Sequence, residues 1–501
     1  MSTCDVLIIG AGSAGCVLAN RLSADPSRNV VVLEAGTRVT DPDMRIPARW
    51  PLNYGRSYDW AYWTIPQRGL DGRRLDWPRG KGLGGSSLMN AMAHMRGCRE
   101  DFDTWVAATG DSRWSWDALL PYFTRLDGAL SVMVPGTDLS SPVVRTYMDS
   151  WHALGVPRID HHNGGEMLGV APNSLTIRDG QRVTVADGYL DPALDRANLT
   201  LIDRSTVHTL DIVNGHVMGV VYERDGTLHR VNADTVILAS GSIGDVLLLM
   251  RSGVGDPAVL NAAGVRTIVE SPEVGRNLHD HLLGAGNVYR SRKDVPPSRL
   301  QGSESMTYLN PDDIGATIGR PEVVVGCVLA PSASATLAPQ IADVQLGDAY
   351  TLLFGTTGPT SRGSLRISGP SVDDEPIIDP NYLDTQFDRD QFAAAFHLAQ
   401  EVGHSEGMAE WRDAEILPVV PLRSRTEVDA FVRQAAITHH HPVGTLRMGS
   451  SEETPVTPDL RLRGLDNCFV ADASVIPRIT SGPVHAAVLA IAESFADRFD
   501  T

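Results

Sequence analysis

Three consecutive histidines, His439, His440 and His441, lie far inside the chain and lead directly into a Pro-Val-Gly-Thr turn. A neutral imidazole has an ordinary pKa near physiological pH, which makes histidine a natural base for removing a hydroxyl proton. In an extended segment side chains alternate between faces, so we expect His439 and His441 to point one way and His440 the other. The three could in principle bind a metal, but no cluster of carboxylates or cysteines accompanies them. We therefore expect proton transfer and no metal.

The N-terminal residues predict a strand, a tight turn, a helix and a second strand. Residues 6–9 and residues 30–33 are short apolar runs suited to strands buried on both faces. Residues 16–22 have helix-compatible apolar spacing, and Asp25-Pro26 marks the turn that follows them. This order is typical of a βαβ unit with parallel strands.

Three glycines in this unit, Gly10, Gly12 and Gly15, have the G-x-G-x-x-G spacing of a dinucleotide-binding turn. Gly10 permits the tight turn, Gly12 lets the backbone approach a pyrophosphate, and Gly15 allows close packing of helix on strand. The helix N-terminus offers free N–H groups to the phosphates. Glu34 ends the second strand, where a carboxylate binds a ribose hydroxyl pair. The motif fits FAD or NAD, whereas the carboxylate disfavours the 2′-phosphate of NADP.

A second glycine-rich segment holds four glycines in six residues, Gly80–Gly85. Such a loop is costly to order unless a ligand holds it, so contact with a flat cofactor is favoured over a flexible surface loop.

The middle of the chain alternates strand-like runs with turns, and its composition changes further on. Residues 198–203 and 217–223 resemble neighbouring strands, with Asn214-Gly215 as a hairpin turn. Residues 235–239 predict a buried strand that leads into a helix at 246–250, and residues 361–367 predict an antiparallel edge. From about residue 284 to residue 432 the chain is richer in proline and serine, which marks the candidate substrate domain.

Composition excludes several classes of partner. The chain has 501 residues, enough for two domains, and its 42% hydrophobic and 21% charged residues are ordinary for a globular protein. The formal net charge of −18 disfavours nucleic acid and anionic membrane surfaces as partners. Five scattered cysteines without a CxxC pair predict neither disulfides nor zinc. We expect no membrane span or targeting segment, and a cytoplasmic monomer.

Seven segments, in this order, resemble the glucose–methanol–choline (GMC) family of FAD-dependent oxidoreductases: Gly10–Glu34, Gly80–Asn90, Gly241–Gly255, Val274–His281, Ser361–Ser364, His441–Gly449 and Asp472–Pro477. The third segment departs from the family pattern, because Asp245-Val246 stands where Ser-Pro is usual. The resemblance implies an α/β protein with a Rossmann-type FAD-binding domain and a discontinuous, antiparallel-sheet (α+β) substrate domain. The expected ranges are 1–140, 186–285 and 438–501 for FAD, and 141–185 and 286–437 for substrate.

The resemblance also assigns residues to the cofactor. Those expected at FAD are Gly10, Gly12, Ser13, Ala14, Gly15, Glu34, Ala35, Gly84, Ser86, Asn90, Ala91, Val207, Asp472, Ala473, Val484 and His485. The family's covalent attachment histidine would lie near Gly85–Asn90, where Ser86, Ser87 and Leu88 stand instead, so non-covalent FAD is expected. His279 and His281 match a stretch that is usually structural in the family.

The same resemblance makes His441 the catalytic base that accepts the hydroxyl proton. Pro483 occupies the place where most members carry a second histidine or asparagine, so we expect His439 to replace that group in binding the substrate. A small, rigid, apolar residue there leaves room for a flat ring, which suggests a planar primary alcohol. The set of His439, His441 and Pro483 resembles the family members that oxidise pyridoxine to pyridoxal and reduce dioxygen to hydrogen peroxide.

Other functions remain open at this stage. The chain could oxidise an aryl alcohol or another primary alcohol, with dioxygen or a different electron acceptor. It could be a lyase that shares the fold, or a flavin-binding protein without turnover. The N-terminal glycine motif taken alone also allows an NAD-dependent dehydrogenase.

Overall fold

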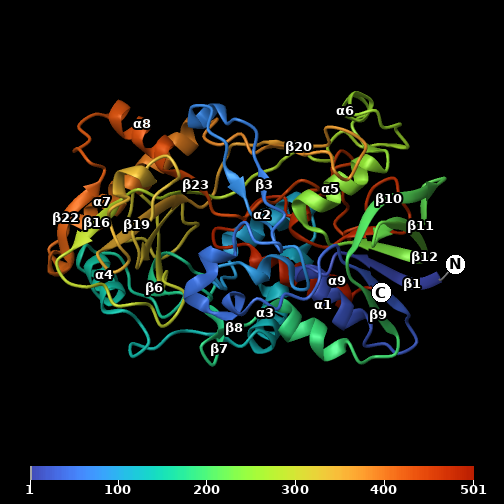
Figure 1. Ribbon diagram of the computed structural model, residues 1–501, viewed down its shortest axis with the longest axis horizontal. Helices are drawn as coiled ribbons and strands as arrows, with labels where there is room; N and C mark the ends of the chain where they lie inside the picture. The colour runs from blue at the N-terminus through green and yellow to red at the C-terminus, as the bar shows by residue number, and fades with distance from the viewer. Residues whose placement is uncertain (1–2, 501) are drawn as a thin grey trace.

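The computed structural model describes residues 3–500 and has two large β-sheets at opposite ends of an elongated molecule, with helices between and around them (Figure 1). Both ends of the chain lie at the end that holds the first sheet. The helices are α1 (Ser13–Leu22), α2 (Arg99–Thr109), α3 (Trp116–Ala129), α4 (Pro142–Ala153), α5 (Gly241–Arg251), α6 (Pro257–Ala262), α7 (Gln386–His404), α8 (Arg425–Ala435) and α9 (His485–Asp497).

The first sheet has a parallel core that the N-terminal unit begins. Its strands are β1 (Thr3–Ile9), β2 (Val30–Leu33), β9 (Leu199–Ile202), β10 (Ser205–Val213), β11 (His216–Arg224), β12 (Thr227–Leu238) and β24 (Cys468–Val470). The order is β10-β11-β12-β1-β2-β9, with β24 beside the last residues of β12. Strand β1 is parallel to β2 and to β12. The predicted βαβ unit is therefore confirmed, with the second strand at the predicted residues.

One predicted strand pairing is wrong. The strand predicted at 217–223 is β11, but its hairpin partner is β10, which the pattern did not reveal, while β9 pairs with β2 at the far edge. Asn214 and Gly215 form the expected turn, with φ angles of 51° and 80°. Two positive φ angles in a two-residue loop match the twist of an antiparallel pair.

Helices cover this sheet and connect it to the rest of the molecule. Helix α1 packs against α9, α9 also packs against α3, and α5 packs against β10. The apolar C-terminal helix α9 is buried over most of its length. Among residues 3–500, no helix combines the length and apolar character that a membrane crossing requires.

The second sheet is antiparallel throughout. Its strands are β6 (Gly169–Pro172), β15 (Leu282–Gly284), β16 (Val288–Ser291), β17 (Ser305–Leu309), β18 (Val323–Val328), β19 (Ala349–Thr356), β22 (Arg412–Leu417) and β23 (Ala436–Thr438). The path is β22-β16-β19-β18-β17-β6, and β15 links β19 to β23. Helix α7 packs on β18 and β19. Strand β15, inside the predicted range 186–285, and β23, which ends at residue 438, both pair in this second sheet.

Short strands complete the fold: β3 (Tyr62–Trp63), β4 (Asp76–Trp77), β5 (Val132–Met133), β7 (Leu175–Arg178), β8 (Gln181–Arg182), β13 (Val254–Gly255), β14 (Val269–Glu270), β20 (Ser364–Arg366) and β21 (Ile377–Asp379). The antiparallel edge predicted at 361–367 corresponds to the pair β20–β21.

Candidate active site

One cavity of about 710 Å³ reaches from the first sheet to the second. At one end it is lined by Ile9, Leu33 and Ala239, which lie at the carboxyl ends of β1, β2 and β12. In open parallel sheets this edge is where ligands bind. At the other end it is lined by side chains of the second sheet, namely Leu283, Met306, Val328, Leu353 and Ile437.

Most residues expected at the cofactor line this single cavity. They are Gly10, Gly12, Ser13, Ala14, Glu34, Ala35, Ser86, Asn90, Ala91, Val207, Asp472, Ala473, Val484 and His485. Gly15 and Gly84 do not line it. Gly15 packs behind the turn, where a Cβ would lie 1.9 Å from the Gly10 carbonyl oxygen, and the Gly84 N–H donates to the Ala11 carbonyl at 2.8 Å.

The position that a side chain on Gly12 would occupy is not filled by other protein atoms. A Cβ on Gly12 would come no closer than 3.8 Å to another protein atom, the Ala239 carbonyl oxygen. Gly85 approaches this turn so closely that its own Cβ would lie 2.7 Å from the Gly12 Cα. The glycine-rich loop is thereby held against the turn, and the absence of a side chain at Gly12 leaves room for a ligand.

The start of α1 supplies unpaired donors beside that space. Gly12 is the N-cap residue of this helix, no side chain caps the N-terminus, and no acidic residue stands in the first turn. These N–H groups are free to bind phosphate oxygens. Nearby, the Glu34 carboxylate accepts hydrogen bonds from the backbone N–H groups of Ala11 and Gly36, each at 2.8 Å, and burial raises its pKa.

Two carboxyl groups meet at the start of α5. Asp472 accepts a hydrogen bond from the Gly241 N–H at 2.5 Å and another from the Ser474 N–H at 2.9 Å. Asp245, the residue that departs from the family pattern, is fully buried and accepts from the Ser240 N–H at 2.9 Å. Burial, and then the neighbouring Asp472 carboxylate, hold the pKa of Asp245 well above its usual range. Burial beside Asp472 therefore favours the protonated form of Asp245.

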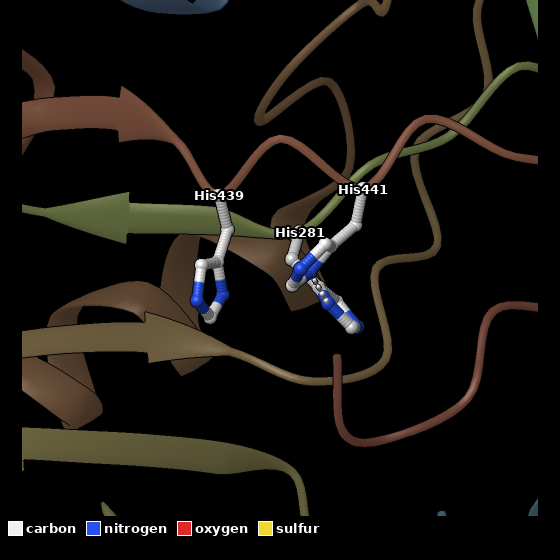
Figure 2. Close-up of side chains that lie close together, drawn as sticks. All are labelled: His281, His439 and His441. Atoms are coloured by element: carbon white, nitrogen blue, oxygen red, sulfur yellow. Dashed lines mark hydrogen bonds between the residues drawn. The ribbon is translucent and has the colours of Figure 1, made fainter. Parts of the chain in front are cut away.

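The histidine run lies at the second-sheet end of the cavity. Strand β23 ends at Thr438 and pairs with β15, so His439 lies opposite His281, and the His439 N–H donates to the His281 carbonyl at 3.0 Å. The side chains of His439 and His441 point to the same side of their segment (Figure 2). Their ring centroids are 4.3 Å apart, and both residues line the cavity.

His440 differs from the extended conformation that was expected. Its φ is 65°, so the segment turns at this residue and does not continue as a strand. Its ring packs edge-on against Tyr54 with centroids 5.1 Å apart, and its carbonyl accepts from the Arg79 guanidinium at 2.7 Å. The ring lies apart from the His439–His441 pair, as expected, although the residue also contributes to the cavity wall.

His281, expected to be structural, is in direct contact with His441. Their Nδ1 atoms are 3.0 Å apart, and the His281 Nε2 lies 2.9 Å from the Thr357 carbonyl oxygen. On the adjacent residue, Asp280 accepts a hydrogen bond from the His441 backbone N–H at 2.6 Å. Sequence reasoning missed both residues, because the pairing of β15 with β23 that brings them here joins distant segments.

These imidazoles are neutral at physiological pH. Burial lowers the pKa of His439 to about 3 and that of His281 to about 4, and it holds the pKa of His441 well below its usual range. The neutral ring has one nitrogen with a free lone pair, which is the form that can accept a proton.

The same three residues have the spacing of a metal site, since one ligand atom of each lies within 4.8 Å of the others. Hydrogen bonds already use both nitrogens of His281 and one of His441. Three of the six ring nitrogens of the cluster are therefore already used in hydrogen bonds.

Pro483 and His485 complete the cavity wall at the start of α9. The His485 Nε2 lies 3.0 Å from the Ser13 hydroxyl, and its Nδ1 has no hydrogen-bond partner among the described residues. Burial lowers the pKa of His485 to about 3, so it is neutral. An unpartnered buried polar atom beside a cavity suggests that a ligand completes its hydrogen bonding.

Further polar residues line the second-sheet end of the cavity and were not expected from the sequence. Asn173 follows β6 and Ser303 precedes β17, and the Asn173 side-chain amide donates to the Ser303 carbonyl at 2.7 Å. The Asn173 Oδ1 and the Ser303 Oγ have no partner within residues 3–500. These two atoms can hydrogen-bond a polar group on a substrate ring.

Known proteins share both the sequence and this architecture. Residues 4–283 and 359–492 match the two family models described as GMC oxidoreductase. The chain is 50% identical to pyridoxine 4-oxidase of Microbacterium luteolum, over 100% of both proteins. It is 33% identical to an oxygen-dependent choline dehydrogenase of Photobacterium profundum, over 99% of this chain and 93% of that protein.

A solved structure extends this likeness to the whole fold. The crystal structure of pyridoxine 4-oxidase from Mesorbium loti matches with a TM-score of 0.95 and 48% identity, covering 99% of each chain. With the family models matching most of its length and the fold shared from end to end, the chain belongs to the GMC oxidoreductase family.

Proposed function

We propose that this protein is an FAD-dependent oxidase that converts pyridoxine to pyridoxal while dioxygen is reduced to hydrogen peroxide. The observation that carries the proposal is that His439, His441 and Pro483 line the same cavity, in a chain 50% identical to a pyridoxine 4-oxidase. The reaction removes two hydrogen atoms from the alcohol and adds them to dioxygen, so its atoms and electrons balance.

The cavity fits FAD. The space beside Gly12, the uncapped start of α1 and the Glu34 carboxylate provide for a pyrophosphate and a ribose. The unpartnered Nδ1 of His485 would be available to hydrogen-bond the bound cofactor. The chemistry that bound FAD supplies is acceptance of a hydride from the alcohol carbon and transfer of the electrons to dioxygen.

The protein's own part is to hold the alcohol and take its proton. We assign His441 as the base that accepts the hydroxyl proton and His439 as the group that binds the same hydroxyl. The two rings are close enough, at 4.3 Å between centroids, to contact one oxygen atom together. Pro483 leaves the remaining side of the pocket free for a flat ring.

Turnover by the purified, FAD-loaded protein tests the proposal. Incubation with pyridoxine under air should yield pyridoxal and hydrogen peroxide in a one-to-one ratio. If pyridoxine neither bleaches the flavin without oxygen nor yields pyridoxal in air, the proposed function is wrong.

A second candidate is oxidation of an aryl or other primary alcohol. The apolar wall formed by Leu283, Met306, Val328, Leu353 and Ile437 supports it, because such a surface accepts any planar ring. The unpartnered atoms of Asn173 and Ser303 favour pyridoxine, whose ring carries polar groups that could bond them. Comparing kcat/KM for pyridoxine and benzyl alcohol, with dioxygen and with an artificial electron acceptor, separates the two.

We further propose non-covalent FAD, a division into the two predicted domains, and a cytoplasmic monomer. All five cysteines are buried and free, which supports a reducing environment. Acid precipitation should release the flavin into the supernatant, and light scattering should give a mass near 54 kDa for the protein.

A further inference from the structure

His281 is buried between a backbone carbonyl and the ring of His441. Only 2% of His281 is exposed, and both of its ring nitrogens have hydrogen-bond partners. The Nε2 lies 2.9 Å from the Thr357 carbonyl oxygen, and the Nδ1 lies 3.0 Å from the His441 Nδ1 (Figure 2). No part of the proposed oxidation described above uses this residue.

The direction of each hydrogen bond follows from the Thr357 carbonyl, which can only accept. The His281 Nε2 must therefore carry the hydrogen. A neutral imidazole has one N–H, so the His281 Nδ1 has a lone pair and accepts. The hydrogen in the second contact consequently belongs to the His441 Nδ1. In a neutral His441 ring this leaves the Nε2 unprotonated.

We propose that His281 is a positioning residue that fixes the tautomer of His441, so that the His441 Nε2 presents its lone pair to the alcohol. The inference rests on the proposed function for the identity of the reaction, but the tautomer itself is a property of the resting protein. In the opposite tautomer the His441 Nε2 would carry a hydrogen and could not accept another proton as a neutral base.

The surroundings hold His281 in this role. Its backbone carbonyl accepts from the His439 N–H, which fixes the main chain. Asp280, the preceding residue, binds the His441 N–H and also accepts from the Thr438 hydroxyl at 2.6 Å. Two successive residues thus orient His441. The Asp280 carboxylate holds the His441 backbone, and the His281 ring holds the His441 ring.

Burial is the main cause that favours neutral His281, and a charged neighbour acts in the same direction. His439 and His441 contribute to its surroundings as neutral rings, and the Arg320 guanidinium disfavours a second positive charge nearby. A protonated His281 would have hydrogens on both nitrogens and could no longer accept from His441. The neutral ring is the form that the hydrogen bonds require.

Three substitutions separate positioning from packing. His281→Asn places an amide oxygen near the position of Nδ1, where it can accept from His441. His281→Gln reaches toward the Thr357 carbonyl but lacks that acceptor, and His281→Leu keeps the volume without either bond. We expect the Asn variant to retain kcat within about tenfold, whereas Gln and Leu lower kcat by about 10²–10⁴-fold with little change in KM, the range typical of a lost general base or a wrong tautomer.

Flavin content and thermal unfolding midpoint are measured on each variant, so that only folded, FAD-loaded protein is compared. A Leu or Gln variant with kcat within about threefold of the wild-type value would overturn the proposal. So would an Asn variant as slow as Leu, because packing rather than the acceptor would then matter.

The tautomer can also be read without substrate. Nitrogen NMR of the ¹⁵N-histidine-labelled, FAD-loaded protein, assigned by comparison with His441→Ala, should show the His441 hydrogen on Nδ1, and this preference should be lost in His281→Leu. A hydrogen on Nε2 in the wild-type protein contradicts the proposal. If the wild-type protein fails to oxidise pyridoxine, the proposed function fails alone, and this measurement still decides the role of His281.

Discussion

The rings of His439 and His441 lie with their centroids 4.3 Å apart at one end of the cavity, although His440 between them turns away. We expect His441→Ala to lower kcat by about 10²–10⁴-fold, the usual contribution of a general base. His439→Ala should mainly raise KM, by about tenfold, because it removes a substrate hydrogen bond. Steady-state kinetics with pyridoxine measures both effects.

His440→Ala serves as the matched substitution within the same run. Its ring packs on Tyr54 and stands apart from the pair, so the loss should be smaller than for either neighbour. Anaerobic flavin reduction is the sharper measurement, because it isolates the proton and hydride step from the reaction with oxygen. An unchanged reduction rate in His441→Ala would show that another group is the base.

Pro483 provides a second test of the role of His439. If His439 replaces the group that this proline does not supply, a histidine introduced at 483 should compensate for the loss of His439. We expect the double variant His439→Ala/Pro483→His to exceed His439→Ala in kcat/KM by about tenfold. A double-mutant cycle with Pro483→His alone gives the coupling between the two positions. Equal activity of the double variant and His439→Ala would mean that the positions act independently.

Gly12 and Gly15 lie three residues apart and should respond differently to the same substitution. At Gly12 a Cβ meets no protein atom within 3.8 Å, so Gly12→Ala should fold but bind FAD more weakly, by about tenfold or more. At Gly15 the Cβ would lie 1.9 Å from the Gly10 carbonyl oxygen, so Gly15→Ala should lose about 1–3 kcal/mol of folding stability.

Flavin absorbance per mole of protein and chemical unfolding of the FAD-free protein distinguish these outcomes. A Gly12→Ala variant that retains FAD fully would indicate that no ligand occupies the space beside that turn.

Local patterns predicted the parts of the site that consecutive residues build. The run Val30–Leu33 was predicted as a strand because it is a short, continuous apolar run rich in β-branched residues, and all four residues are buried. The glycine spacing before it predicted the turn. Strand β10 was missed because its buried and exposed residues alternate irregularly and its pairing with β11 has bulges. Its predicted cavity residue, Val207, was inferred from the family resemblance alone.

Contacts between distant segments could not be predicted in the same way. His281 meets His441 only because β15 pairs with β23, and Asp245 meets Asp472 across 227 residues of chain. The sequence showed that Asp245 departs from the family pattern but gave no partner for it. Long-range pairing of this kind depends on the whole fold, whereas hydrophobic periodicity reports only on the element that contains it.

Asp245 should make stability depend on pH. Burial and Asp472 raise its pKa above the ordinary 3.8, so the folded protein holds a proton that the unfolded chain releases. The stabilising free energy that comes from holding this proton is fully present below the ordinary pKa of 3.8. It is lost as the pH rises through the raised pKa of the folded protein. Asp245→Asn keeps the shape and cannot ionise. We expect the thermal midpoint of this variant, relative to that of the wild-type protein, to increase as the pH rises above the ordinary pKa of 3.8. A constant difference over that range would show that Asp245 does not titrate there.

Removal of metal ions should leave the enzyme active. A zinc ion bound by His281, His439 and His441 would need a lone pair from each, but His281 already uses one nitrogen to donate to Thr357 and the other to accept from His441. An ion would have to displace the shared hydrogen and disrupt the orientation of the base. Dialysis against EDTA, followed by metal analysis and assay with pyridoxine, should therefore yield metal-free protein with unchanged kcat and flavin content. Activity that falls on dialysis and returns with Zn²⁺ would instead make the cluster a metal site.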